Sequence, residues 1–367
     1  MDLEIEREAL LRRLQSVMGV VERRQTLPIL ANVLLEVEGQ TLWVTATDLE
    51  VEITTSVDAT VTTEGQITLP ARKLMDIVRN LPEGARAQLQ REGEQVRVRS
   101  GRSRFQLGAL AATDYPKVEG IGESQALRLP QESMRWLLEK TQFCMAVQDV
   151  RYFLNGLLLE LEPERLRAVA TDGHRLALAD VAAPEGLRQG KQVIVPRKGV
   201  QELLRVLERS SEPVRVELGE NHVRVELDGL RLTSKLIEGR FPDYTGVIPD
   251  GNGPCLGAER EALRQALVRV SILSNEKYRG VRWVLEPDSL RIHSNNPEQE
   301  EAEEWVGVSY DGGAMEVGFN ASYLLDALGA VANDQVRIYL RDASSSALIM
   351  GDGEAESCRY VVMPMRL

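Results

Sequence analysis

The sequence is poor in the residues from which metal centres and many enzyme sites are built. Its 367 residues include three cysteines (Cys144, Cys255 and Cys358) and three histidines, and no CxxC pair occurs. The odd number and wide spacing of the cysteines argue against a disulfide framework or a zinc site. No HExxH, GxSxG or GxGxxG motif is present, which removes the usual signatures of zinc proteases, serine hydrolases and dinucleotide-binding proteins. We therefore expect no cofactor and no metal.

Long apolar runs are also missing. No stretch reaches the roughly 18 apolar residues that a membrane-spanning helix needs. The N-terminal sequence MDLEIEREALLRRL is charged and amphipathic and lacks the apolar core of a signal peptide. With 43% hydrophobic and 27% charged residues, the composition is typical of a soluble globular protein. These features favour a cytoplasmic location without membrane contact.

An excess of positive charge is absent as well, because 44 Lys and Arg face 56 Asp and Glu, a net charge of −12. Proteins that bind nucleic acid through many phosphate contacts are usually basic. The basic residues are unevenly distributed along the chain, however. An acidic exterior with a basic lining would hold DNA loosely rather than grip it.

A repeat of 124 residues organises the chain, because the strings TATD, VATD and HSNN end at Asp48, Asp172 and Asn296. Each string follows a strand-like run, such as LLLELEPERLRAV before Asp172. The period is far longer than that of a solenoid repeat, so each copy is expected to be a whole domain.

Two helices are predicted in each repeat. One begins each repeat, at 6–17, 130–141 and 259–270, and the pentapeptide EREAL occurs in the first and third of these segments. The other follows LPARKL (69–74), IVPRKGV (194–200) or GFNASYL (318–324), with apolar residues spaced as on one helix face. The segments between helices alternate in polarity, as in 214–236, which predicts antiparallel hairpins.

These patterns predict an α+β protein of three similar domains, each of two helices backed by antiparallel β-sheet. Glycine-rich polar segments near 122 and 251 suggest the boundaries 1–122, 123–250 and 251–367. Three such domains in a row favour an arc. An arc whose two ends differ but fit each other would close as a head-to-tail dimeric ring.

The string TDGHRL (171–176) is the most catalysis-like in the chain, since an aspartate two residues from a histidine could orient the imidazole as a general base. No nucleophile or second carboxylate has an identifiable place beside Asp172 and His174. The corresponding positions of the other repeats carry different chemistry, which favours a binding surface or a plain turn. We expect no catalysis.

Basic residues recur on the predicted helices and suggest a surface that faces DNA, although solvated helix faces would give the same pattern. The helix at 322–332 is an exception without Lys or Arg. The candidates for DNA contact are Arg24, Arg72, Lys73, Arg79, Arg197 and Lys198.

Two clusters of opposite charge lie near opposite ends of the chain. Complementary charges would orient a head-to-tail contact, and apolar residues beside them would stabilise it. A charge run in a solvated loop is the alternative. The candidate residues are Arg102, Arg104, Phe105 and Leu107 at one end, and Ile272, Leu273, Glu300, Glu301, Glu303 and Glu304 at the other.

Many strings, in order along the whole chain, resemble one family: the bacterial DNA polymerase III beta subunit, or sliding clamp. The most specific are GRSRF (101–105), QDVRYFLNG (148–156), ATDGHRLA (170–177), SNEKYRGVR (274–282), NNPEQEEAEE (295–304) and YVVMPMRL (360–367). The resemblance implies a ring of two head-to-tail protomers around duplex DNA, with helices inside and sheets outside. It also implies a non-catalytic processivity factor that a clamp loader places on DNA.

The resemblance further implies a pocket for short peptides of partner proteins: the polymerase III catalytic subunit, other polymerases, and mismatch-repair and ligase proteins. A Met- and Val-rich cleft suits such varied peptides. The sequence departs from the family at Thr245-Gly246, where many relatives have a basic residue. The implied pocket residues are Leu154, Thr171, Gly173, His174, Arg175, Leu176, Pro242, Val247, Ser346, Val361, Val362, Met363, Pro364 and Met365, and Gln148, Arg151 and Tyr152 are added to the DNA-facing set.

Two other functions stay open from the sequence. One is an enzyme that acts on DNA ends with Asp172 and His174, against which the absence of a metal set speaks. The other is a scaffold that binds proteins but not DNA.

Overall fold

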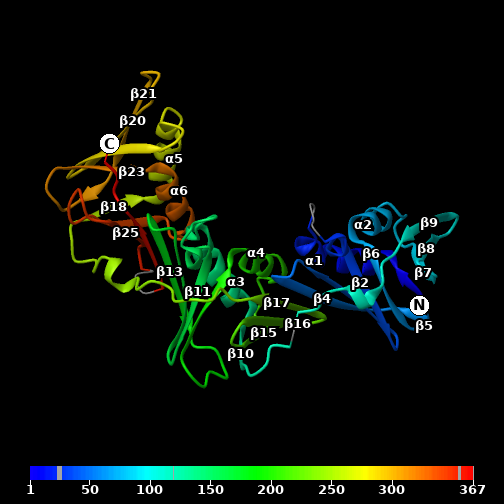
Figure 1. The fold of residues 1–367 in the computed structure, drawn as a ribbon. Coiled ribbons are helices and arrows are strands. Elements are labelled where there is room, and N and C mark those ends of the chain that lie inside the picture. Colours follow the sequence, from blue (N-terminus) through cyan, green and yellow to red (C-terminus); the bar gives the residue numbers. More distant parts are fainter. Residues whose placement is uncertain (23–26, 119, 354–356, 367) are drawn as a thin grey trace. The chain divides into compact units, whose positions relative to one another are not determined.

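The computed structural model describes residues 1–22, 27–118, 120–353 and 357–366. Within them the chain forms six α-helices and antiparallel sheets, as expected for an α+β protein (Figure 1). Two compact units emerge. The first unit comprises Met1–Glu132, Glu185–Arg188 and Lys198–Leu236, and the second comprises Ser133–Pro184, Gln189–Arg197 and Ile237–Leu367.

The first unit contains two sheets. The five-stranded sheet has the order β5 (Thr60–Thr63), β1 (Asp2–Glu6), β7 (Arg86–Glu92), β8 (Gln95–Ser100) and β9 (Ser103–Gly108). The eight-stranded sheet has the order β10 (Gln125–Pro130), β15 (Pro213–Leu218), β16 (His222–Leu227), β17 (Leu230–Lys235), β4 (Val51–Asp58), β3 (Thr41–Thr47), β2 (Asn32–Glu38) and β6 (Gly65–Pro70).

The second unit has the same plan. Its nine-stranded sheet runs β14 (Lys191–Pro196), β11 (Gly156–Glu162), β12 (Arg165–Thr171), β13 (Arg175–Ala182), β26 (Cys358–Val362), β25 (Ala347–Gly351), β24 (Gln335–Tyr339), β18 (Cys255–Glu259) and β22 (Ser309–Tyr310). Its four-stranded sheet runs β21 (Glu301–Gly307), β20 (Ser289–Asn295), β19 (Gly280–Glu286) and β23 (Met315–Asn320).

The largest sheets join strands from different copies of the repeat. In the first unit β17 pairs with β4, with Leu230 opposite Thr55. In the second unit β13 pairs with β26, with Arg175 opposite Val362. Because these pairings link segments more than a hundred residues apart, the compact units do not follow the repeats of the sequence.

The helices lie where the apolar spacing predicts them. Helix α1 (Arg7–Val17) packs on α2 (Ala71–Arg79) and β4, and α5 (Arg260–Ser271) packs on α6 (Ala321–Ala330) and on β20 and β21 (Figure 1). Their inward positions are buried, as shown by Leu10, Leu14, Leu74 and Val78 in the first pair. No helix among the described residues is long and apolar enough to cross a membrane. The other two helices are α3 (Gln131–Thr141) and α4 (Arg197–Val206).

The arginine of the repeated pentapeptide EREAL has the same structural role in both copies. Its arginine opens helix α1 as Arg7 and helix α5 as Arg260. Arg7 donates to the carbonyls of Val78 and Arg79 at the end of α2, at 3.2 and 2.7 Å. Arg260 donates to the carbonyl of Asn333, beyond the end of α6, at 3.0 Å. In both copies a cation therefore binds a carbonyl at the C-terminal end of the second helix or just beyond it, where the helix dipole favours positive charge.

Helix α6, which lacks basic residues, receives a cation from another helix. The ammonium group of Lys140 on α3 bonds the carbonyl of Ala330, the last residue of α6. The C-terminal end of α6 is thus bonded by a basic side chain of α3 and not by one of its own.

Candidate functional site

A hollow of about 710 Å³ opens over one face of the nine-stranded sheet in the second unit, and we call it the pocket. Its walls come from the turn before β13, from strands β13 and β26, and from segments 242–253 and 339–346. The segment Phe241–Gly251, which we call the strap, crosses this face of the sheet and buries Phe241 and Tyr244 against it.

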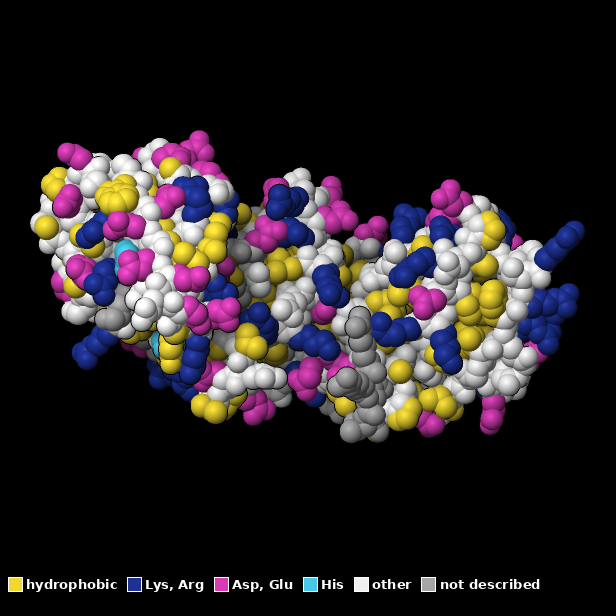
Figure 2. Space-filling model, turned by 90° about the horizontal axis from the view of Figure 1, so that it is seen from above, with side chains coloured by type: hydrophobic (Ala, Val, Ile, Leu, Met, Phe, Trp, Pro, Cys, Tyr) yellow, Lys and Arg dark blue, Asp and Glu magenta, His cyan; other side chains and the backbone are white. Residues whose placement is uncertain are grey.

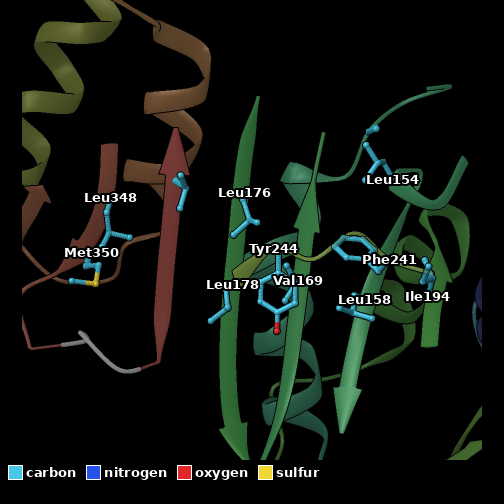
Figure 3. Packing of buried hydrophobic residues seen from close by; sticks show 12 residues of the cluster. Leu154, Leu158, Val169, Leu176, Leu178, Ile194, Phe241, Tyr244, Leu348 and Met350 are labelled. Atoms are coloured by element: carbon cyan, nitrogen blue, oxygen red, sulfur yellow. The ribbon is translucent and has the colours of Figure 1, made fainter. Parts of the chain in front are cut away.

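The floor of the pocket is apolar and preformed. Leu154, Leu176 and Val361 belong to one buried cluster, which also contains Tyr244 of the strap (Figure 3). At the mouth, Val247 and Met363 are 55% and 49% exposed. An apolar floor with exposed apolar side chains at its rim suits the apolar anchors of a peptide.

The turn Thr171–Arg175 forms one wall and is fixed by its own side chains. Thr171 Oγ1 donates to the carbonyl of Arg175 at 2.7 Å and accepts from the Gly173 amide at 3.1 Å. Asp172 Oδ1 accepts from the amides of His174 and Arg175 at 2.9 and 3.1 Å. Gly173 has a φ of +87°, a conformation that glycine adopts readily.

Arg175 lines the pocket, but its guanidinium group is already engaged. It donates to Asp172 Oδ2 at 3.0 Å, to Asp326 Oδ2 at 2.5 Å and to the Phe143 carbonyl at 2.8 Å, and it lies 4.5 Å from the Tyr323 ring centre. Because its guanidinium already has these partners, Arg175 stabilises the pocket wall and is not a free donor for a ligand. The described residues show no hydrogen bond between the Asp172 carboxylate and the His174 imidazole, so they do not support a catalytic Asp–His pair.

Arg151, assigned to the DNA-facing set from the sequence, lines the pocket. Its guanidinium binds the Asp149 carboxylate with two contacts of 3.0 and 2.9 Å and donates to the Asp172 carbonyl at 3.2 Å. The Arg151 hydrogen bonds lower the pKa of Asp149 to about 2. The loop before β11 is thereby tied to the turn that carries His174.

Most of the expected pocket residues surround this one hollow. Those that line it are Leu154, Thr171, Gly173, His174, Arg175, Leu176, Pro242, Val247, Ser346, Val361 and Met363. Val362, Pro364 and Met365 are not part of the lining. Val362 alternates with Val361 along β26 and is buried, while the Met365 amide donates to the Gly318 carbonyl at 2.9 Å and attaches this segment to β23.

Sequence reasoning placed Pro242 and Val247 of the strap and Ser346 before β25 in the pocket but missed other lining residues of these segments. The additional lining residues include Phe153, Asp243, Tyr244, Ile248, Tyr339, Arg341, Ser344 and Ser345. Alternation along β24 would have placed Tyr339, but the strap is irregular and has no periodic signal.

The candidate DNA-facing residues occupy helices α2 and α4 and the loop before β11. Lys73 and Arg79 on α2 are exposed, and Figure 2 shows several Lys and Arg side chains on the face viewed there. Arg72 lies half-buried on α2, Lys198 pairs with Asp48, and Arg197 donates to the Met145 carbonyl at 3.0 Å. Gln148 has a φ of +54° and Tyr152 is 56% exposed. Arg24 lies outside the described residues.

The candidate contact residues lie on two edge strands or beside them. Arg104, Phe105 and Leu107 belong to β9, at one edge of the five-stranded sheet. Arg102 lies just before this strand. Glu301, Glu303 and Glu304 belong to β21, at one edge of the four-stranded sheet, and Glu300 precedes it. Ile272, at the end of α5, is 72% exposed, and Leu273 is half-buried. Trp305 on β21, 62% exposed, was missed.

Part of the acidic cluster is neutralised within the chain. Glu304 binds Arg269 with two contacts of 2.6 and 2.8 Å, and Glu303 binds Arg291 at 3.0 Å. Fewer free carboxylates than the sequence suggested are therefore available to a basic partner surface.

The described residues contain no group of three or more His, Cys, Asp or Glu side chains placed to hold a metal ion. Cys144 is buried, and burial raises the pKa of its thiol.

Family models of the DNA polymerase III beta subunit match nearly the whole chain: the N-terminal domain at residues 1–119, the central domain at 128–243 and the C-terminal domain at 245–366. The chain is 52% identical to the beta sliding clamp of Pseudomonas putida and 50% identical to that of Escherichia coli, each over all of both chains.

Solved structures agree with these sequence matches. The DNA polymerase III beta subunit of Pseudomonas aeruginosa superposes with a TM-score of 0.96 at 50% identity, and that of Caulobacter crescentus with 0.95 at 42% identity, each over all of both chains. Family models, relatives and structures all point to one assignment: the chain belongs to the DNA polymerase III beta subunit family, the sliding clamps, which are non-catalytic processivity factors of DNA replication.

Proposed function

We propose that this sliding clamp encircles duplex DNA as a head-to-tail dimer and tethers its partners through the pocket over the nine-stranded sheet. The observation that supports the tether most directly is the preformed apolar floor of Leu154, Leu176 and Val361 with Val247 and Met363 at its mouth. Such a site takes the Leu and Phe side chains of a short peptide and leaves its backbone in solvent.

The proposed ring consists of six domains, three from each protomer, with boundaries at 1–122, 123–250 and 251–367. Edge strands β9 and β21 are the proposed contact surfaces, since each leaves backbone groups on one side for another strand. Exposed Ile272 and half-buried Phe105 would supply the apolar part of the contact, and Arg102 and Arg104 would face the remaining acidic groups. Leu107, expected at this contact from the sequence, is only 7% exposed in the single chain.

DNA would be held by topology rather than by affinity. Lys73, Arg79, Lys198 and Tyr152 are proposed contacts that need not recognise sequence. A net charge of −12 is compatible with this role, because few phosphate contacts keep binding weak and sliding free.

The proposed partners are a clamp loader, the polymerase III catalytic subunit, other polymerases, and mismatch-repair and ligase proteins, all acting in the cytoplasm. A test loads the labelled protein onto nicked circular plasmid with a clamp loader and ATP, and then linearises half of the isolated complex. Loss from linear but not from circular DNA, with little dependence on moderate salt, is expected for a ring. Equal retention on both forms, falling steeply with salt, would refute encirclement.

The pocket is tested separately by deleting residues 363–367 and, more mildly, by Met363→Ser. Both variants should remain ring-shaped on circular DNA but bind partner peptides more weakly. Because the Met363 amide donates to the His174 carbonyl, the single substitution leaves that backbone bond in place. Unchanged peptide affinity in both variants would refute the pocket assignment.

A further inference from the structure

A second recess, of about 390 Å³, lies on the same face of the nine-stranded sheet and shares the strap residues Tyr244 and Ile248–Gly251 with the pocket. Leu176 of β13 and Val361 of β26 line the pocket, and the residues two positions along those strands, Leu178 and Arg359, line the recess. Side chains two apart on a strand face the same side, about 7 Å from each other. The recess is therefore a continuation of the pocket's sheet face beyond the strap.

The floor of the recess is apolar. Leu178, Leu348 and Met350 belong to the same buried cluster as the pocket floor, and Figure 3 shows Leu178 and Met350 on the same side of the sheet as Leu176 and Leu348. Ile248 and Pro249 of the strap close it from the side. An apolar side chain placed there would meet apolar groups on two sides.

Two arginines enter this apolar recess, and their situations differ. Arg167 is buried and neutralised: it binds the Asp180 carboxylate with contacts of 2.7 and 2.8 Å and the Tyr244 hydroxyl at 3.2 Å. The Arg359 side chain is half-buried and has no hydrogen bond or ion pair with any described residue. Asp250, the acidic residue at the rim, instead accepts from the Asn252 amide at 3.2 Å.

Arg359 is half-buried as a residue, and its guanidinium has no counter-ion among the described residues, so it can accept an anionic partner without breaking an existing ion pair. A carboxylate brought to it would form a charge-assisted, two-pronged hydrogen bond, the strongest pairing available to arginine. The recess thus offers Arg359 to an acidic group and, next to it, an apolar floor to an apolar side chain.

We propose that the second recess binds an acidic residue and a neighbouring apolar residue of the same partner segment whose anchors occupy the pocket. This inference rests on the peptide-binding function proposed above. About four extended residues suffice to cross the strap from one hollow to the other. Partners that carry such an acidic-apolar extension would bind more tightly than partners with the anchors alone.

The test compares labelled peptides on the full-length protein by fluorescence anisotropy. A short peptide with Leu and Phe anchors is extended at either end by a Gly-Ser spacer followed by Glu-Leu, or by Lys-Leu as the charge control. The Glu-Leu extension at one end should lower the Kd of the wild-type protein by about fivefold to tenfold, and the Lys-Leu extension should not. Arg359→Ala should abolish the gain and leave the short peptide's Kd unchanged.

Arg282→Ala is the matched control, since this exposed arginine lies on β19 of the other sheet and pairs with Glu316 at 2.9 Å. It should retain the gain. If the short peptide binds but neither extension tightens it, or if the gain survives Arg359→Ala, the second recess is not a peptide site. If the short peptide itself fails to bind the wild-type protein, the peptide-binding function falls, and this inference falls with it.

Discussion

Leu49 and Gly173 occupy the same position in two copies of one turn, and both have positive φ, +77° and +87°. The surrounding hydrogen bonds correspond one to one. Thr47 Oγ1 accepts from the Leu49 amide at 3.1 Å, as Thr171 Oγ1 does from Gly173. Asp48 Oδ1 accepts from the Glu50 amide at 2.9 Å, as Asp172 Oδ1 does from His174. The first copy therefore holds a leucine in a backbone conformation that suits glycine.

At position 49 glycine should give a more stable protein than alanine, the reverse of the order usual elsewhere in a folded chain. A residue with a Cβ costs roughly 1–2 kcal/mol in this left-handed region, whereas glycine does not. Leu49→Ala and Leu49→Gly both lose the leucine side chain, so their difference isolates the backbone term. We expect Leu49→Gly to be more stable than Leu49→Ala by about 1 kcal/mol, measured by urea denaturation. Alanine at least as stable as glycine would show that the turn is not strained.

The second copy predicts the opposite result, because Gly173 is already relaxed. A Cβ at this position would lie 2.8 Å from Arg151 Nη1, so Gly173→Ala adds backbone strain and also displaces the guanidinium from the pocket wall. The free energy of unfolding should fall by about 1–2 kcal/mol, and a labelled peptide with Leu and Phe anchors should bind more weakly. Gly39→Ala is the control for strain alone, since Gly39 has a φ of +58° and a Cβ added there would have no described neighbour within 4 Å. If Gly173→Ala and Gly39→Ala bind the peptide with equal affinity, the conformation of Gly173 does not influence the pocket.

The sequence predicts the parts of this protein whose signals are local. Helices α1 to α6 follow from apolar residues at helical spacing, and the hairpin β15–β17 follows from alternation between glycine turns. The pocket residues near Leu176 and Val361 come from the resemblance, because only the folded sheet brings β13 and β26 together.

The remainder depends on long-range packing. Phe241 and Tyr244 are buried only because the strap crosses the sheet, and no periodic pattern announces that crossing. Arg151 shows the same limit: it is exposed, as expected of a charged loop residue, but only the fold shows that Asp149 and the Asp172 carbonyl hold it in the pocket wall. Only alternation along β26, which places Val361 and Val362 on opposite faces, could have removed Val362 from the expected lining.

The arginine of the repeated pentapeptide should contribute similarly in both copies. Arg7→Ala leaves the carbonyls of Val78 and Arg79 without their charged donor, and Arg260→Ala does the same to Asn333. Each substitution should lower the free energy of unfolding by about 1–3 kcal/mol, because hydrogen bonds to charged groups are stronger than neutral ones. Exposed Arg12→Ala on helix α1 is the matched control and should change it by less than about 0.5 kcal/mol. Urea midpoints of Arg7→Ala and Arg12→Ala that coincide would contradict the capping role.

Glu202 on α4 should destabilise the protein at neutral pH. Its side chain is buried, Oε2 has no hydrogen-bond partner among the described residues, and the carboxylate fills the space beside Gly19. Burial raises the pKa of Glu202 above its ordinary value of 4.5, although Arg205 and Lys198 act in the opposite direction. A folded-state pKa above the unfolded one means that the stability due to this group is fully present below pH 4.5 and is lost as the pH rises.

Glu202→Gln removes the ionisable group, so the variant should gain stability relative to the wild type as the pH is raised from 4 to 8. The gain should vanish below about pH 4.5, where the wild-type carboxyl is protonated in both states. Thermal midpoints measured across this range, with exposed Glu208→Gln as the control, give the difference directly. A difference that does not change with pH would mean that the carboxylate is fully compensated by Arg205 and Lys198.

The proposed contact between edge strands is most vulnerable at Ile272 and Leu273. Ile272 is 72% exposed in the single chain, although an isoleucine gains free energy by leaving water, and Leu273 beside it is half-buried. Truncating both to alanine should weaken a head-to-tail dimer by several kcal/mol in total, roughly a hundredfold or more in its Kd, because packed apolar groups at the centre of an interface carry most of its stability. Light scattering at decreasing concentration should then show monomers where the wild type remains a dimer.

Val247→Ala removes another exposed apolar side chain, at the pocket mouth, and should leave the dimer intact while weakening peptide binding. If the double variant keeps the wild-type mass at every concentration, the apolar part of the contact must lie elsewhere, and Trp305 on β21 becomes the next residue to truncate.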